Sequence, residues 1–257
     1  MQRTYLGLMG VAAMLWASAS AQADLYDSPA TYRIRITQDT NGYAMGNAGE
    51  FTIENAPTPP GENLPASVVF GAASDKNGTS FQTFCVEYSE HINPPANYWA
   101  DITEYATGGN GGWDGNKGPG GSHSDDLSYG TAYLYTQFRT GALFSAGYQS
   151  APSFARENDA RALQIAIWLL EGERTEGQLA GETNLAQGKI WRDQAVSAVA
   201  NNVWTAGLGN VRVLNLWGDA GRTEFRQDQL IMIPAPGAAL LATLGLAMVG
   251  FVRRRFA

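Results

Sequence analysis

The chain has 257 residues, and its 24 acidic residues outnumber its 17 basic ones, for a formal net charge of −7. Four of the basic residues, Arg3 and the arginines at 253–255, lie in terminal segments that hold no acidic residue. The region between them therefore carries 13 basic and 24 acidic residues, a net charge of −11. Such an acidic region is a poor partner for nucleic acid or anionic lipid. It is long enough to form one sizeable domain that buries a core without disulfides.

Residues 1–23 have the pattern of a secretory signal peptide. Arg3 supplies a positive start, an apolar or small run follows at 6–17, and Ala21-Gln22-Ala23 is a small-x-small cleavage site before Asp24. We therefore expect an exported protein whose mature chain begins at Asp24.

Most of the mature region has the apolar pattern of β-strands. Strict alternation of polar and apolar residues predicts a strand at Tyr32–Thr37. Runs of β-branched and aromatic residues predict further strands at 50–53, 66–70, 81–88, 211–217 and 229–233. Three helices are predicted between the strands, at 128–140, 157–171 and 187–203. We expect one α+β domain over 24–233, a mainly antiparallel β domain with a helical insertion.

The segment 107–126 is rich in glycine. It cannot bury enough apolar surface to order itself, so we expect a surface loop. Its acidic residues Asp114, Asp125 and Asp126 lack the order and the bidentate glutamate of an EF-hand. We therefore expect no metal site here and no cofactor elsewhere.

The tail 234–257 has three parts. Pro234-Ala235-Pro236-Gly237 is followed by an apolar run of 15 residues at 238–252 and by the arginines at 253–255. As a helix the run would be roughly 22 Å long, which is short of the ~30 Å hydrocarbon core of a bilayer. Because arginines stay on the cytoplasmic side, residues 24–233 would lie outside.

This tail resembles the PEP-CTERM sorting signals of bacteria that have an exosortase system, with Ala235 where the name-giving glutamate stands. The resemblance implies a C-terminal sorting enzyme as partner. The protein would be anchored transiently in the membrane by its short helix and then transferred to the cell surface or extracellular matrix. The alternative is a permanent C-terminal anchor.

Cys85 is the single cysteine of the chain. Exported proteins usually pair their cysteines, so an odd one suggests an intermolecular bridge, a reactive thiol or some other covalent use. It could be a small buried hydrophobe in a strand. It could also be the nucleophile of a cysteine hydrolase, which needs a histidine base. Only His91 and His123 are available, and neither is predicted to be pre-organised beside it.

Gln164 suggests a third use for the thiol, because it interrupts an apolar helix and its amide is costly to bury without a partner. Attack of the Cys85 thiol on the Gln164 carboxamide would release ammonia and leave an internal thioester. The reaction needs proximity, a polarised carbonyl and the exclusion of water. Phe84, Tyr88 and Trp168 could provide the apolar cover.

Two motifs, Phe84-Cys85-Val86 and Gln164-Ile165-Ala166-Ile167-Trp168, resemble those of the TQXA-type thioester domains of bacterial surface adhesins. Leu163 stands where a threonine often precedes the glutamine. The resemblance implies a bond between Cys85 and Gln164 that captures a nucleophile, typically a lysine amine. It implies one capture event without turnover, so we do not expect an enzyme.

The expected function is therefore that of an exported adhesin that attaches covalently to an amine-bearing surface protein or polysaccharide matrix. The alternatives are a passive biofilm-matrix or envelope protein without this bond, and a cysteine hydrolase. Glu87, His91, Tyr133 and Tyr135 are candidates to assist the chemistry, and the spacing does not choose among them.

Overall fold

A computed structural model describes residues 30–38, 44–45, 48–57, 62–65, 68, 79–107, 124–149 and 153–233. These residues form an α+β fold in which the sheets are antiparallel and the helices follow one another between β8 and β9. The predicted fold class, a mainly antiparallel β domain with a helical insertion, is confirmed.

Six strands form the main sheet, in the order β10-β9-β6-β1-β4-β5. They are β1 (Tyr32–Gln38), β4 (Phe51–Asn55), β5 (Ser80–Thr83), β6 (Ala96–Thr103), β9 (Val211–Trp217) and β10 (Phe225–Met232). In β1, Ile34 and Ile36 are buried while Arg35 between them is exposed, as period-2 alternation requires. Two small ribbons pair β2 (Ala44–Met45) with β3 (Ala48–Gly49), and β7 (Tyr105–Thr107) with β8 (Ser124–Asp126).

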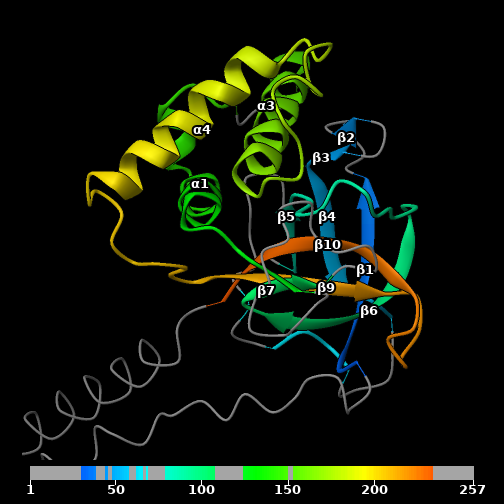
Figure 1. Ribbon diagram of the computed structural model, residues 1–257. Coiled ribbons are helices and arrows are strands. Elements are labelled where there is room, and N and C mark those ends of the chain that lie inside the picture. Colours follow the sequence, from blue (N-terminus) through cyan, green and yellow to red (C-terminus); the bar gives the residue numbers. More distant parts are fainter. Residues whose placement is uncertain are drawn as a thin grey trace, which may run out of the picture.

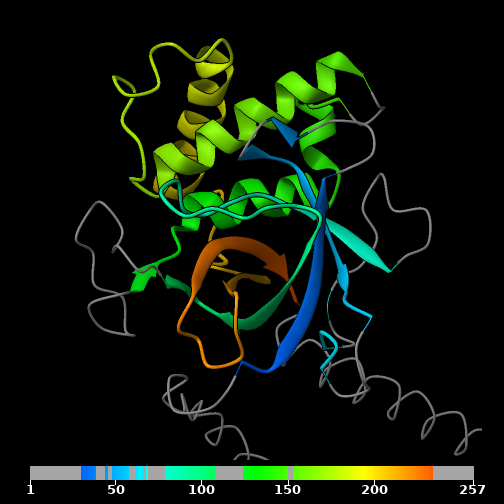
Figure 2. The same ribbon diagram turned by 90° about the vertical axis from the view of Figure 1, so that its right-hand side faces the viewer.

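The main sheet curls strongly (Figure 2), and its two edge strands, β5 and β10, come into contact. Just after the end of β5, Cys85 forms an antiparallel bridge to Gln229 in β10. We call this contact between residues 82–87 and 227–230 the seam. The seam therefore joins two segments that are far apart in the sequence.

The helices are α1 (Tyr129–Arg139), α2 (Ala142–Ser145), α3 (Phe154–Leu170) and α4 (Leu185–Ala200). The three long ones gather on one side of the sheet (Figure 1). Ser128 caps α1 by accepting from the N–H of Thr131, and Ser153 caps α3 by accepting from the N–H of Arg156. All three predicted helices are confirmed, although α3 begins earlier than predicted because Ser153 is its N-cap.

Close packing of α4 fixes the place of α3. A Cβ built on Gly188 of α4 would lie 2.6 Å from Ile165 Cγ2 and 2.9 Å from the backbone oxygen of Ala162. Only a glycine allows the two helix backbones to approach this closely. The position of α3 over the sheet therefore depends on a residue outside it.

Two apolar cores lie on opposite faces of the curled sheet. The outer core fills the space between the sheet and the helices, with Phe84, Leu163 and Trp191 among its members. The inner core is enclosed by the curl of the sheet and includes Ile53 and Cys85. Phe84 and Cys85, which are neighbours at the seam, therefore pack into different cores.

Some predicted strands have other bounds. The strand predicted at 81–88 ends at Thr83 as β5, because the following residues pair with β10 across the seam. β10 begins at Phe225, before the predicted 229. β6 was not predicted, although it is central, because Asn97 and Asp101 interrupt its apolar pattern and its neighbours in the sheet decide its conformation.

Several predictions lie outside the described residues. These are the signal peptide (1–23), nearly all of the strand at 66–70, most of the glycine-rich loop (107–126) and the sorting tail (234–257). Where the structure is described, no helix combines the length and the apolar character needed to cross a membrane.

Candidate functional site

Cys85 lies where the sheet nearly closes on itself. On either side of it, the N–H of Val86 donates to the Asp228 oxygen at 2.9 Å, and the N–H of Leu230 donates to the Phe84 oxygen at 3.1 Å. In an antiparallel pair, a residue between two such bonds directs its own N–H and C=O away from the partner strand. The backbone groups of Cys85 therefore need a partner from elsewhere.

Gln164 of α3 is that partner. The N–H of Cys85 donates to Gln164 Oε1 at 2.9 Å, and Gln164 Nε2 donates to the Cys85 oxygen at 2.7 Å. The carboxamide takes the place that the peptide group of a further strand would take. Only 1% of Gln164 is exposed. Two residues that are 79 positions apart in the sequence are thus in direct contact.

The Cys85 thiol faces the inner core and is completely buried. Its Sγ accepts a hydrogen bond from Gln229 Nε2 at 3.4 Å. Burial raises the pKa of the thiol to about 12; the bond from Gln229 lowers it, and the charge of Glu87 raises it. At neutral pH the sulfur is therefore protonated and poorly nucleophilic on its own.

Buried carboxyl groups lie on both segments of the seam, Glu87 on one and Asp228 on the other. Burial is the main cause that raises the pKa of Glu87 well above its ordinary value, followed by the charges of Asp228 and Glu90. The pKa of Asp228 is also raised well above its ordinary value, by burial and by Glu90, against hydrogen bonds from the backbone N–H groups of Thr107 and Leu216. Burial, and after it repulsion between the carboxyl groups, thus favours the protonated forms of Glu87 and Asp228.

Aromatic residues flank both halves of the pair. Tyr88 follows Cys85, and Trp168 lies one turn after Gln164 on α3. Their rings meet edge to face with centroids 4.8 Å apart, and the guanidinium carbon of Arg174 lies 3.3 Å from the Tyr88 centroid. Phe84, the third predicted shield, points to the outer core. Tyr88 and Trp168 therefore pack together beside the pair.

The predicted helpers are placed very differently. Tyr135 donates its hydroxyl to the oxygens of Gln82 and Leu230, which ties the two edges of the seam together. Tyr133 packs against Trp204, and His91 is exposed. Of the candidates, Glu87 is the one whose charge acts on the Cys85 thiol. His123, the second histidine that a hydrolase could use, lies outside the described residues.

Gln229, which touches the sulfur, and Asp228 beside it were not predicted to belong to the site. A signal existed, because Gln227, Asp228 and Gln229 are three consecutive polar residues directly before the apolar run Leu230–Met232, and the structure buries all three in β10. Polar side chains at buried strand positions need a specific reason. Their relation to Cys85 depends on the curl of the sheet, which no local pattern predicts.

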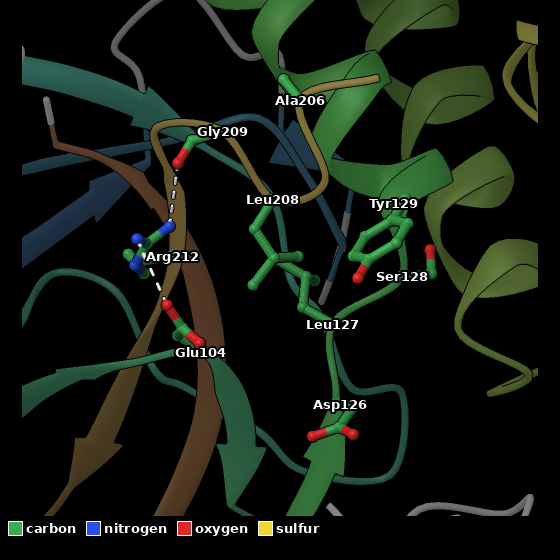
Figure 3. Close-up of a pocket in the computed structure, with 9 residues that line it drawn as sticks. All are labelled: Glu104, Asp126, Leu127, Ser128, Tyr129, Ala206, Leu208, Gly209 and Arg212. Carbon is green, nitrogen blue, oxygen red and sulfur yellow. Dashed lines mark hydrogen bonds and ion pairs between the residues drawn. The ribbon is translucent and has the colours of Figure 1, made fainter. Parts of the chain in front are cut away.

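A separate pocket opens beside the start of α1 (Figure 3) and has a volume of about 670 Å³. It is lined by Glu104, Asp126, Leu127, Ser128, Tyr129, Ala206, Leu208, Gly209 and Arg212. Arg212 is bound to Glu104 at 3.3 Å and to the Gly209 oxygen at 3.1 Å, so its charge is already paired. Neither Cys85 nor Gln164 lines this pocket.

Metal chemistry has no site in the described part of the chain, where no group of three or more His, Cys, Asp or Glu residues could hold an ion.

Comparison with known protein families finds no matching family model, and no curated protein matches the chain. The contacts of Cys85 and Gln164 are therefore the basis for a functional interpretation.

Proposed function

We propose that this is an exported surface or matrix protein in which Cys85 and Gln164 join in an internal thioester that captures amines covalently. The observation that carries the proposal is the pair of hydrogen bonds between the Gln164 carboxamide and the backbone of Cys85. They hold the electrophile against the residue that bears the nucleophile, inside a site from which water is excluded.

The first bond polarises the carboxamide. During attack by sulfur, negative charge develops on Gln164 Oε1, and the N–H of Cys85 already donates to this atom at 2.9 Å. A preorganised donor aimed at the developing charge is the main element of an oxyanion hole. Supplying both the nucleophile and this donor from one residue is a geometry that acyl-transfer enzymes also use.

The second bond holds the leaving group. Gln164 Nε2 donates to the Cys85 oxygen at 2.7 Å. As the S–C bond forms and the C–N bond breaks, the thiol proton passes to this nitrogen, which departs as ammonia. The sum is thiol plus carboxamide giving thioester plus ammonia, with no oxidant or reductant. Departure of ammonia leaves the Cys85 oxygen without its donor.

That vacated acceptor favours an amine as the captured nucleophile. A primary amine can take the position of the lost ammonia and donate an N–H to the Cys85 oxygen while it attacks the thioester carbon. The C–N bond forms, the C–S bond breaks and the amine proton passes to sulfur. One capture uses up the thioester, so the protein does not turn over and is not an enzyme.

The sequence supports the setting of this reaction. The signal peptide at 1–23 and the sorting tail at 234–257 favour export, transient membrane anchoring and processing by a sorting enzyme. The partner class is an amine-bearing surface protein or a polysaccharide matrix. The resemblance of the two motifs to thioester adhesin domains favours attachment as the purpose.

A passive matrix or envelope protein is the second candidate, and one observation favours it. The Gln164 carboxamide satisfies the backbone of Cys85, which is a sufficient structural reason for a buried glutamine. The thiol pKa of about 12 also suits an inert buried cysteine. The two candidates differ in the fate of one bond.

Intact mass measurement separates them. We expect the purified wild-type chain to be lighter by one ammonia than its sequence mass, and to gain one methylamine when treated with it, located on Gln164 by peptide mapping. Cys85→Ala should have its full sequence mass and gain nothing. A wild type of full mass with one titratable thiol would instead identify the passive protein.

A further inference from the structure

A second buried glutamine lies on the other side of the sulfur. Gln229 is directly opposite Cys85 in the bridge that closes the seam, at a position where the backbones do not bond to each other and side chains come closest. Its Nε2 lies 3.4 Å from Cys85 Sγ, and its side chain is fully buried. Cys85 is thus held between two carboxamides, with Gln164 at its backbone and Gln229 at its sulfur.

The orientation of the Gln229 amide is fixed by a second contact. Its Nε2 also donates to the Gln227 oxygen at 3.1 Å, so both acceptors, an oxygen and a sulfur, lie at the nitrogen end. Its Oε1 is buried without a hydrogen-bond partner among the described residues. An unfilled buried acceptor costs stability. The two contacts of Nε2 therefore turn the nitrogen end of the Gln229 amide toward the sulfur.

We propose that Gln229 is a catalytic residue of the thioester chemistry, and that its N–H stabilises the negative charge that the Cys85 sulfur carries when the S–C bond forms and breaks. The inference rests on the proposed function. In thioester formation the sulfur gives up its proton to the leaving nitrogen. In amine capture the C–S bond breaks, and the electron pair returns to sulfur before the amine proton reaches it.

The need for such a donor follows from the surroundings of the sulfur. The site is completely buried, so a thiolate there would be strongly disfavoured, and the charge of Glu87, where that carboxyl is ionised, raises the pKa of the thiol further. Among the residues that the structure describes, Gln229 supplies the side-chain N–H that donates to the sulfur. A hydrogen bond to the charged form of a group favours that form, so both directions of the reaction gain from it.

The test compares Gln229→Met with Gln227→Met in the full-length chain. The two glutamines are two residues apart on β10, both are buried, and each has an Oε1 that accepts no hydrogen bond from the described residues. Gln227 Nε2, however, donates to the Glu87 oxygen and not to the sulfur. Gln227→Met therefore removes a similar amide from the same strand and leaves the donor to Cys85 in place.

The readouts are the extent of ammonia loss in the purified chain and the rate of methylamine incorporation, both by intact mass. We expect Gln229→Met to slow incorporation about 10- to 100-fold, the effect of losing one hydrogen bond to a charged atom, or to leave ammonia loss incomplete. Gln227→Met should stay within about twofold of the wild type, since it retains the bond to sulfur. Equal rates in all three chains would overturn the role of Gln229.

Gln229→Glu keeps the shape of the side chain and covers the case in which Gln229→Met does not fold. A carboxylate has no donor and adds negative charge, so capture should be slower than in the wild type at neutral pH. A protonated carboxyl regains an O–H donor. With hydroxylamine as nucleophile, we therefore expect partial recovery as the pH is lowered. A rate that is unaffected by this substitution and by pH contradicts the proposal.

The outcomes also distinguish this inference from the proposed function. If the wild-type chain has its full sequence mass, it contains no thioester, and both the proposed function and the role of Gln229 are wrong. If the thioester maps to Cys85 and Gln164 but the rate of methylamine incorporation does not change when Gln229 is substituted, only the role of Gln229 is contradicted. A thioester mapped to Gln229 would overturn both assignments, because Gln229 would then be the electrophile.

Discussion

Two buried polar clusters lie along α3, and their charges are compensated in opposite ways. Near the start of the helix, Arg156 Nε donates to Glu50 Oε2 at 3.2 Å, and the Tyr148 hydroxyl donates to the same oxygen at 2.8 Å. The side chains of Arg156 and Glu50 are 1% and 0% exposed. This cluster joins one cation to one anion and surrounds both with hydrogen bonds.

The seam, two turns further along α3, is built differently. The charges that act on Glu87 there come from Asp228, Glu90 and Glu173, and each raises its pKa further. Gln227 and Gln229 each leave Oε1 without a hydrogen-bond partner among the described residues. The seam therefore keeps neutral, proton-bearing groups beside a protonated thiol.

This difference separates the structural role of the first cluster from the chemical role proposed for the seam. A paired and satisfied cluster fixes the position of an element, whereas strongly perturbed groups concentrate where chemistry needs them. Arg156 holds the first turn of α3 against Glu50, and the same rigid helix presents Gln164 to Cys85. We infer that the first cluster sets the geometry on which the second depends.

Breaking the paired cluster should have the largest effect. Arg156→Ala leaves the Glu50 carboxylate buried without its cation, which should cost about 3–5 kcal/mol of unfolding free energy. Urea denaturation followed by tryptophan fluorescence measures it. A loss below about 1 kcal/mol would contradict the view that this ion pair fixes α3.

A matched double variant sharpens this result. Arg156→Met combined with Glu50→Gln removes both charges while keeping similar volumes, so it should lose less stability than Arg156→Ala alone. If the double variant also retains methylamine capture, the cluster acts through the position of α3 and not through its charge.

The carboxyl groups of the seam predict a smaller effect with an unusual dependence on pH. The pKa of Glu87 is raised well above its ordinary value of 4.5 in the folded state. Below that value both states hold the proton. Above it the unfolded chain releases the proton while the folded chain keeps it, so stability falls as the pH rises until the folded pKa is reached. One such group contributes up to about 1.4 kcal/mol per pH unit.

Urea denaturation between about pH 5 and 8 tests this sign. Glu87→Gln removes one titrating group, so the fall in unfolding free energy should become less steep, and the variant should be more stable than the wild type at the upper end. Glu54→Gln, at a half-buried position in β4 whose side chain is 40% exposed, is the control for exchanging a carboxyl for an amide. A wild type that gains stability over this range would show that other groups dominate.

The parts of the fold that depend on local pattern were predictable. The alternation in Tyr32–Thr37 and the apolar helix around Gln164 both correspond to observed elements, β1 and α3. β6 was not predicted, because its polar residues gain their places only from strands on both sides. Burial by distant neighbours can override the preference of a short segment.

The candidate site was also predictable only in part. A lone cysteine in a chain predicted to be exported and a glutamine in an apolar helix identify Cys85 and Gln164 as unusual residues, and the structure shows that they touch. Gln229 belongs to the site only because the sheet curls until β10 meets the end of β5. That contact depends on the accumulated twist of six strands, which no short motif records.

The smallest predicted effect is at an ion pair outside both clusters, and it calibrates the comparison. Arg35 and Glu54 lie opposite each other on β1 and β4, with a nitrogen–oxygen distance of 3.6 Å and side chains that are 45% and 40% exposed. Because water already solvates both charges, Arg35→Ala should change the unfolding free energy by less than about 1 kcal/mol. The difference between wild type and variant should shrink further in added salt. A loss as large as that of Arg156→Ala would mean that burial is not what distinguishes these pairs, and the contrast drawn along α3 would lose its physical basis.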